Sequence, residues 1–342
     1  MPVAIEAASA EAAVASLRER RLRRGSIRER GKRLRIGLVN NMPDAAWLAT
    51  ERQFAGLLND AAEDFDVRLS LWTLETLDRQ QETRRAMAGQ YRAARDLRGA
   101  ECDALIVTGA EPRAPDLRQE PYWRELTALF DWAEARTFST VLSCLAAHAS
   151  VLHRDGIVRR RLAAKCSGVF ATELVARHEI VEGFDPANSM PHSRWNGLDE
   201  DELAAKGYLT LTRSDRAGVD IFVRDGLSLQ VFLQGHPEYD ADTLAREYRR
   251  DLLRFLGGAT SAPPQIPHDY FPPPLAELLA AFAGRAASMA DDPGANFPPQ
   301  ALAITSASWR GTSVRLFRNW LAAVARRKAA LSAPSSAARR GG

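Results

Sequence analysis

Short apolar runs alternate with segments of helical periodicity along the first half of the chain, and this alternation constrains the fold most. The strand-like runs are residues 34–40, 67–74, 102–107 and 138–142. The helix-like segments between and after them are residues 46–61, 122–135 and 145–152. Strands separated by helices of this length form a mostly parallel sheet with helices on both faces. The sequence therefore predicts an α/β fold whose functional groups gather where the strands end.

The second half is less regular. Three further strands are expected at residues 209–213, 219–223 and 227–233, followed by a helix at 242–255. Prolines concentrate from residue 263 onward, and they indicate an insertion at about 274–300 with one short helix near 275–287. A last amphipathic helix is expected at 314–325. We therefore expect an N-terminal extension over 1–32 that is partly helical, one domain over 33–325, and a disordered basic tail over 326–342.

Composition excludes several classes of protein. The net charge of +3 is too small to indicate a nucleic-acid partner, and the basic runs lie near the two chain ends. Three cysteines without paired spacing argue against a disulfide framework and for a reducing compartment. No apolar run is long enough to span a membrane, and the start of the chain lacks a signal-like apolar core. We expect a cytoplasmic protein without a membrane or nucleic-acid partner.

Polar residues follow the strand-like runs at Asn40, Thr108, Cys144 and His236. Cys144 stands between a strand and a helix, where a nucleophile is exposed and helix amides favour a negative charge. His236 can act as a base at neutral pH. Glu238 can orient the His236 ring if the chain turns at Pro237. Either feature alone is more often structural, but together they predict a Cys–His–Glu catalytic group.

Other candidates for chemistry are weaker. Cys102 and Cys166 have no neighbouring base in the sequence, so a structural role is the better interpretation of each. His148 lies one helical turn after Cys144 and fits packing as well as a role at the site. The sequence has no glycine-rich phosphate loop and no cysteine/histidine spacing typical of zinc, so no metal is expected.

A set of motifs in a fixed order carries a family resemblance. They are N-N-M-P at 40–43, T-E-R-Q-F at 50–54, A-L-I-V-T-G-A at 104–110, K-C-S-G-V-F at 165–170, M-P-H-S-R-W at 190–195, G-H-P-E-Y-D-A-D-T-L-A-R-E-Y-R-R-D at 235–251, Y-F-P at 270–272, S-W-R at 308–310 and N-W-L at 319–321. With these motifs, from about residue 33 to 325, the chain resembles the homoserine O-succinyltransferase family. That family comprises methionine-pathway acyltransferases on a class I glutamine-amidotransferase-like (flavodoxin-like) fold.

The resemblance implies a ping-pong acyl transfer with no bound cofactor and with acyl-CoA, succinyl-CoA or acetyl-CoA, as co-substrate. Cys144 would carry the acyl group, His236 would take the proton of the homoserine hydroxyl, and Glu238 would orient His236. Backbone N–H groups near Gly109 and Leu145 would hold the oxyanion. These functions also imply small-molecule substrates rather than macromolecular partners, and the family's tendency to dimerise implies a homodimer.

The resemblance also implies substrate-binding residues. Arg250 would bind the carboxylate of the amino acid, and Lys165 and Ser193 fall at positions that face the substrate. Arg113 falls at the position that separates succinyl-CoA from acetyl-CoA users, where glycine and glutamate are usual. We hypothesise that Arg113 pairs with the free carboxylate of a succinyl group. It would replace the lysine that usually follows N-x-M-P, where this chain has Asp44.

Three alternatives stay open at this point. The acceptor could be another hydroxyl compound, such as serine or a secondary metabolite, because residues around Cys144 depart from the family pattern. The same Cys–His–Glu group could serve a glutamine amidotransferase or a hydrolase, although the glycine-flanked elbow typical of amidotransferases is absent around Cys144. A non-catalytic regulator is disfavoured, since it has no physical need to keep Cys144, His236 and Glu238 together.

Overall fold

The computed structural model describes residues 3–6, 32–286 and 297–332, and within them 11 strands form one sheet. The sheet order is β1-β3-β2-β5-β6-β11-β10-β9-β7-β8, with β4 beside β3. The strands are β1 (Val3–Glu6), β2 (Lys32–Val39), β3 (Phe65–Thr73), β4 (Tyr91–Ala93), β5 (Ala104–Val107), β6 (Ser139–Ser143), β7 (Arg160–Leu174), β8 (Asn188–Gly197), β9 (Leu209–Ser214), β10 (Gly218–Arg224) and β11 (Leu229–Leu233). Every pair from β1 to β11 along this order is parallel, and the pairs from β11 to β8 are antiparallel.

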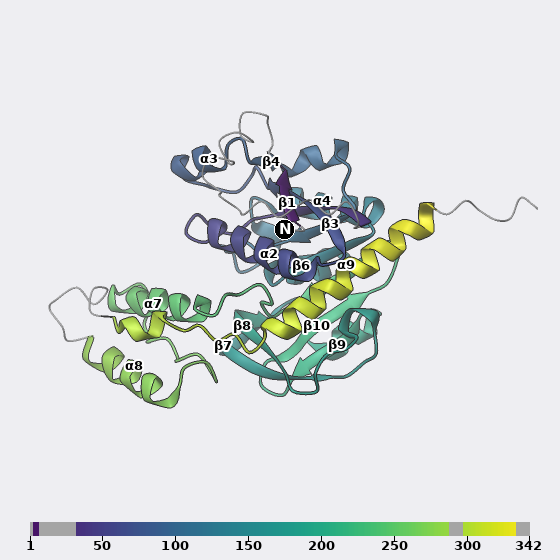
Figure 1. The fold of residues 1–342 in the computed structure, drawn as a ribbon. Helices are drawn as coiled ribbons and strands as arrows, with labels where there is room; N and C mark the ends of the chain where they lie inside the picture. The colour runs from purple at the N-terminus through teal and green to yellow at the C-terminus, as the bar shows by residue number, and fades with distance from the viewer. Residues whose placement is uncertain (1–2, 7–31, 287–296, 333–342) are drawn as a thin grey trace, which may run out of the picture.

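Helices cover both faces of the parallel part, as the sequence predicted (Figure 1). The helices are α2 (Trp47–Ala61), α3 (Gln81–Met87), α4 (Trp123–Arg136), α5 (Leu145–Asp155), α6 (Glu200–Ala205), α7 (Thr243–Leu256), α8 (Pro273–Ala286) and α9 (Arg310–Ser332). Short 3-10 turns are η1 (Ala94–Gly99), η2 (Leu117–Gln119), η3 (Glu179–Val181) and η4 (Pro299–Leu302). One buried cluster joins β2 and β3 to α2 and α9, and a second joins β5 and β6 to α4 and α5. The mostly parallel α/β class is therefore confirmed.

A third buried cluster lies apart from the sheet. It joins α7, α8 and the turn η4 through the side chains Ala245, Tyr248, Leu252, Phe271, Leu279, Phe282, Phe297 and Ala301. These elements form a lobe beside β7 and β8 (Figure 1). The helix expected near 275–287 is therefore confirmed as α8, while residues 287–296 of the predicted insertion lie outside the described residues.

The two predicted ends need correction. Residues 326–332 are not a disordered tail, because α9 runs to Ser332. Its basic side chains pair with the body: Arg326 with Glu179, Arg327 with Asp225, and Lys328 with Asp103. These ion pairs hold the end of α9 against the body of the protein, although its basic composition suggested a solvated tail. At the other end, residues 3–6 form β1, a strand that the sequence did not predict, and the expected helix falls in residues 7–31, outside the described part.

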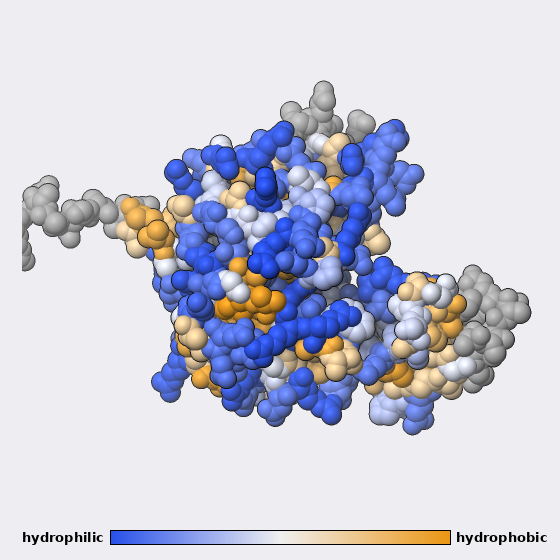
Figure 2. Space-filling model, turned by 180° about the vertical axis from the view of Figure 1, so that it is seen from behind, coloured by the Kyte–Doolittle hydropathy of each residue, from blue (hydrophilic) through white to orange (hydrophobic). Residues whose placement is uncertain are grey.

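The surface is hydrophilic over most of the face seen from behind, with a few separate hydrophobic patches (Figure 2). Among the residues described, no helix combines the length and apolar character needed to cross a bilayer. The same residues contain no group of three or more His, Cys, Asp or Glu side chains that could hold a metal ion.

Candidate active site

Cys144 occupies a strained turn between β6 and α5. Its backbone has φ 50° and ψ −108°, a region that residues other than glycine rarely enter. Its N–H donates to the carbonyl of Leu233 at 2.7 Å, and its own carbonyl accepts from the His148 N–H at 3.2 Å. A sharp strand-to-helix turn of this kind presents a nucleophile at the end of the sheet. The Cys144 side chain is partly exposed there, so a substrate can reach the thiol.

His236 follows β11, the strand next to β6. The two strands are parallel and in register, with Leu233 opposite Ser143, so Cys144 and His236 leave neighbouring strands at the same edge. The His236 N–H donates to the carbonyl of Pro191 at 2.8 Å. The alternating sequence pattern predicted both groups at strand ends, and the structure adds that the two strands are neighbours.

Glu238 lies directly behind the His236 ring. The chain turns through Pro237, with the Tyr239 N–H donating to the His236 carbonyl, and Glu238 Oε1 is 2.9 Å from His236 Nδ1. Both side chains are buried, and the Tyr239 ring stacks on the imidazole with centroids 4.4 Å apart. The predicted pairing of base and carboxylate is therefore present in this geometry.

The charge balance around His236 favours its protonated form. Burial acts to lower the pKa of His236, but the charge of Glu238 and interactions with Cys144 outweigh it, so the pKa lies well above its usual value. The buried Nε2 atom makes no hydrogen bond of ordinary geometry to another described residue. It is thus available to exchange a proton with Cys144 or with a substrate atom beside it.

Gly109 and Leu145 meet next to Cys144. A Cβ atom placed on Gly109 would lie 2.9 Å from the Leu145 Cβ and 3.1 Å from the Leu145 nitrogen, so a side chain there would require a shift of the helix start. Among the described residues, neither the Gly109 N–H nor the Leu145 N–H donates to another part of the chain. Two free N–H groups beside a nucleophile fit an oxyanion site.

Lys165 and Arg250 come together at Asp251, although they are far apart in the sequence. Lys165 Nζ is 2.7 Å from Asp251 Oδ2, and Arg250 Nη2 is 2.8 Å from Asp251 Oδ1. Burial acts to raise the pKa of Asp251, but Lys165 and Arg250 outweigh it and hold that pKa below its usual value. The cluster joins β7 to α7, and the Arg250 side chain remains 45% exposed, so it can still meet a ligand.

Ser193 and Arg113 have different surroundings. Ser193 lies on β8 opposite Ser167 of β7, on the antiparallel side of the sheet. The Arg113 side chain is 75% exposed, and its guanidinium lies 3.1 Å from the carboxylate of Asp78. The structure therefore places Arg113 in a surface ion pair and does not bring it to Cys144. Its predicted role with the acyl group stays a prediction without a supporting contact.

Asp44, at the position for which the resemblance implied lysine, serves the local structure. Its carboxylate accepts from the Gln80 N–H at 2.8 Å and lies 3.5 Å from Arg79 Nη1. Arg79 also donates to the carbonyls of Asn40 and Met42, so this buried cation holds the loop after β2. A negative charge in place of the expected positive one therefore goes with a loop that Arg79 and Asp44 hold in a fixed position.

The surroundings of Cys102, Cys166 and His148 fit the structural roles that the sequence favoured for the two cysteines and allowed for His148. Burial raises the pKa of Cys102 to about 12 and also raises that of Cys166. His148 is buried on α5, with Nε2 3.0 Å from Gln234 Oε1, and burial lowers its pKa to about 3. No disulfide joins the three cysteines, all of which lie in the described part.

Sequence reasoning missed a buried network beneath the His236 turn. His192 Nε2 lies 3.4 Å from Asp220 Oδ1, and the side chain of Arg194 donates to His192 Nδ1. Because a guanidinium is only a donor, this contact assigns the neutral ring with its proton on Nε2, facing Asp220. A Cβ on Gly235 would lie 2.7 Å from Asp220 Oδ1, so the network packs directly against the turn. The motif M-P-H-S-R-W contains two of its members.

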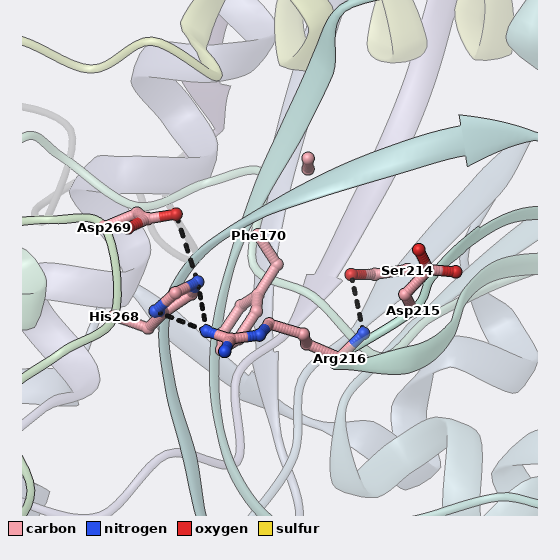
Figure 3. Close-up of a pocket in the computed structure, with 7 residues that line it drawn as sticks. Phe170, Ser214, Asp215, Arg216, His268 and Asp269 are labelled. Atoms are coloured by element: carbon pink, nitrogen blue, oxygen red, sulfur yellow. Dashed lines mark hydrogen bonds and ion pairs between the residues drawn. The ribbon is translucent and has the colours of Figure 1, made fainter.

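A pocket of about 420 Å³ lies elsewhere, between β7, the β9–β10 turn and the segment before α8 (Figure 3). Its lining residues are Phe170, Ala171, Ser214, Asp215, Arg216, His268 and Asp269. The Arg216 guanidinium lies against both ring nitrogens of His268, and Asp269 lies 3.0 Å from the same ring. None of the Cys144 group lines this pocket, and three of its lining side chains, Arg216, His268 and Asp269, contact one another.

Comparisons with known proteins identify the family to which the chain belongs. The family model "Homoserine O-succinyltransferase" matches residues 6–330. A homoserine O-succinyltransferase of Rhodopseudomonas palustris is 51% identical over 295 residues, 85% of this chain and 88% of that protein. One of Methylorubrum extorquens is 47% identical over 300 residues, 87% of this chain and 89% of that protein. A solved glutamine amidotransferase of Thermotoga maritima has a TM-score of 0.48 at 12% identity, covering 85% and 98% of the two chains. On the family match and the curated relatives, the chain belongs to the homoserine O-succinyltransferase family.

Proposed function

We propose that this chain transfers a succinyl group from succinyl-CoA to the hydroxyl of homoserine, a step of methionine biosynthesis, through a thioester on Cys144. The observation that carries the proposal is the strained turn at Cys144, beside the buried His236–Glu238 pair on the next strand. Family membership supports the choice of donor and acceptor.

The first half-reaction forms the acyl-enzyme. Cys144 gives its proton to His236, and its sulfur attacks the carbonyl carbon of the thioester. The Gly109 and Leu145 N–H groups donate to the oxyanion, and each such donor lowers the barrier by roughly 3 kcal/mol. The bond to the CoA sulfur then breaks, and His236 returns its proton so that CoA leaves as a thiol. Glu238 stabilises the imidazolium between these transfers.

The second half-reaction uses the same groups in reverse. The homoserine hydroxyl gives its proton to the neutral His236 ring as its oxygen attacks the Cys144 thioester. The bond from carbon to the Cys144 sulfur breaks, and the product ester leaves. The free enzyme is restored with its original number of protons.

The amino-acid acceptor would be held by the cluster at Asp251. Arg250 would bind the homoserine carboxylate, since a guanidinium pairs with a carboxylate through two parallel hydrogen bonds. Lys165 holds Asp251 in place from β7, and Ser193 would line the opposite side. Asp251 itself is an acceptor for the homoserine ammonium. Charge complementarity of this kind suits a zwitterionic substrate better than a neutral one.

Mass spectrometry of the intact protein tests the proposal. After brief incubation with succinyl-CoA, we expect a mass increase of one succinyl group that is absent from Cys144→Ala. Homoserine should discharge the adduct and yield O-succinylhomoserine. An adduct that serine discharges and homoserine does not would overturn the acceptor. Hydrolysis of the adduct by water, unchanged by either amino acid, would indicate a hydrolase instead, and no adduct from any acyl-CoA would overturn the acyl-transfer proposal.

A further inference from the structure

Arg159 is a partly buried cation without a carboxylate partner. It lies just before β7, and its Nη2 atom is 3.5 Å from the carbonyl of Pro115 in the loop after β5. Within the described residues no Asp or Glu oxygen lies within 4.0 Å of its guanidinium, whereas Lys165 and Arg250 both pair with Asp251. Since a partly buried guanidinium is normally paired, an unpaired one points to an anion that binds from outside.

Tyr122 adds a second unsatisfied group on the same side. Its side chain is 4% exposed, and its hydroxyl oxygen is buried without a hydrogen-bond partner in the described chain. Burial and the charge of Glu120 raise the pKa of Tyr122 well above its usual range, while Arg159 acts in the opposite direction. The hydroxyl therefore keeps its proton and can donate a hydrogen bond.

The neighbouring carboxylate of Glu120 is already occupied. Its Oε1 atom accepts from the N–H groups of Arg113 and Ala114 at 2.6 and 2.5 Å, which shapes the loop after β5. Glu120 thus serves the loop rather than pairing with Arg159. Beside it, the Tyr122 hydroxyl has no partner among the described residues, and Arg159 has only its long contact with the Pro115 carbonyl.

Both donors lie on the side of the nucleophile. Burial acts to lower the pKa of Arg159, and the charges that oppose it come from Tyr122, Cys144 and Glu120. No direct hydrogen bond joins Arg159 to Cys144 in the described structure, so the thiol does not occupy the guanidinium. The same loop carries Gly109, which abuts the helix start at Leu145.

We propose that Arg159 and Tyr122 form the subsite that binds the free carboxylate of the acyl group on Cys144. The inference rests on the proposed function and names the residues that select a dicarboxylic acyl donor. In the succinyl thioester, two methylene groups separate the bound carbonyl from the carboxylate. Arg159 donates to that carboxylate, and the Tyr122 hydroxyl supplies another hydrogen bond.

This subsite selects against acetyl-CoA, because an acetyl group would leave the hydrogen-bond donors of Arg159 and Tyr122 unpaired. An acetyl group carries no carboxylate, so the partly buried guanidinium and the buried hydroxyl would stay unsatisfied in the acyl-enzyme. Sites built to hydrogen-bond a substrate group reject analogues that lack it for this reason. Arg159 thereby takes the selecting role that the sequence suggested for Arg113, which the structure places in an exposed ion pair with Asp78.

The test compares donors in one assay. The rate of acylation of Cys144 is measured with succinyl-CoA and with acetyl-CoA, and the ratio of kcat/KM values is the readout. For Arg159→Gln we expect the preference for succinyl-CoA to fall by at least about 10-fold, and for Tyr122→Phe by a smaller factor. Arg159→Lys should restore part of the preference, because it keeps the charge but not the paired geometry.

Two matched arginines serve as controls. Arg160→Ala removes the adjacent side chain, which is exposed and pairs with Asp199 and Glu202, and Arg113→Ala removes the earlier candidate. Neither should change the donor ratio. An unchanged ratio in Arg159→Gln and Tyr122→Phe, or a lost preference in Arg113→Ala, would overturn the subsite while leaving the acyl-transfer proposal intact. If the wild-type protein forms no adduct with either donor, the proposed function fails and this inference fails with it.

Discussion

At the scale of single residues, this site depends on groups whose surroundings oppose their usual state. Cys144 is held at positive φ, His236 is buried yet keeps a raised pKa, and His148 is buried in its neutral form. Each is stabilised by a specific neighbour: Leu233 for the turn, Glu238 for the first imidazole and Gln234 for the second. The direction in which a substitution of Glu238 or Gln234 shifts the pKa of its histidine can therefore be predicted.

Replacing Glu238 by glutamine should slow the reaction and move its pH dependence. Glu238 is the largest of the contributions that raise the pKa of His236, so its loss lowers that pKa. In the proposed mechanism His236 must be neutral to accept the homoserine proton, so the acid limb of the pH–rate profile should move to lower pH. We expect kcat to fall by about 10²- to 10⁴-fold, as for other triad carboxylates.

Kinetics across a pH series check this prediction, with Glu173→Gln as control, since Glu173 lies in an exposed pair with Arg213. A Glu238→Gln enzyme whose acid limb stays in place would show that Glu238 only supports the fold.

His148 should make the protein sensitive to acid. Its pKa is about 3 in the folded protein and about 6.5 when exposed, so the unfolded state binds the extra proton between these values. Stability is therefore lost as pH falls below about 6.5, at up to about 1.4 kcal/mol per pH unit. His148→Asn should remove this part of the slope, and His153→Asn, a partly exposed histidine paired with Asp131, should not.

Urea unfolding at several pH values between 4 and 7 measures the slope. If His148→Asn keeps the wild-type slope, other groups govern acid unfolding.

The sequence predicts these residues unevenly, for physical reasons. Cys144 and His236 could be found because the carboxyl ends of parallel strands lie at one edge of the sheet, so residues that follow such strands gather there. Lys165 and Arg250 were assigned through family position, and their meeting at Asp251 depends on the packing of α7 against β7. Arg159 could not be found, because an unpaired cation is recognisable only when every neighbouring carboxylate has been placed.

At the scale of elements, the antiparallel half of the sheet was the hardest to predict. β7 and β8 alternate weakly because many of their side chains are half-exposed, so the hydrophobic pattern that marks a buried strand is missing. The C-terminal end of α9 was missed for a related reason. Its last turns are polar, and they are held by ion pairs with Glu179, Asp225 and Asp103 rather than by burial.

Gly168 joins β7 to the segment before α8, and alanine there should be strongly destabilising. Gly168 has φ +144°, and a Cβ atom would lie 2.4 Å from both the nitrogen and the oxygen of His268. The two segments exchange hydrogen bonds at this point, from Val169 N–H to His268 O and from His268 N–H to Ser167 O. The clash must break them, so we expect Gly168→Ala to cost at least about 2 kcal/mol of unfolding free energy.

Gly207→Ala is the matched control, because Gly207 also has positive φ but has no atom within 4 Å of the added Cβ. It isolates the backbone strain, which is about 1 kcal/mol. Equal losses in the two variants, measured by chemical denaturation, would contradict a role for the His268 contact.

At the scale of the whole molecule, the candidate site lies between the large core of the parallel sheet and the smaller core of the α7–α8 lobe. Cys144 and His236 lie at the edge of the parallel sheet, whose clusters cover both faces. Arg250 and Asp251 lie on α7, whose apolar side packs in the smaller cluster with α8 and η4. The Lys165–Asp251 ion pair bridges β7 and α7. If Arg250 binds the acceptor as proposed, these charged contacts couple acceptor binding to the stability of the lobe.

Hydrogen exchange should report this coupling. A lobe with a small separate core opens more easily than the central sheet, so amides in α7 and α8 should exchange faster than those in β2 and β6. The test uses Cys144→Ala, which cannot turn over. Saturating homoserine should slow exchange in α7 of this variant, because its carboxylate would bind Arg250 and stabilise the folded form of the lobe. Arg250→Gln in the same background should remove that protection and leave β6 unchanged. Protection that persists without Arg250, or that appears in β6 and not in α7, would mean that homoserine is held by the sheet, and the lobe would then have no part in acceptor binding.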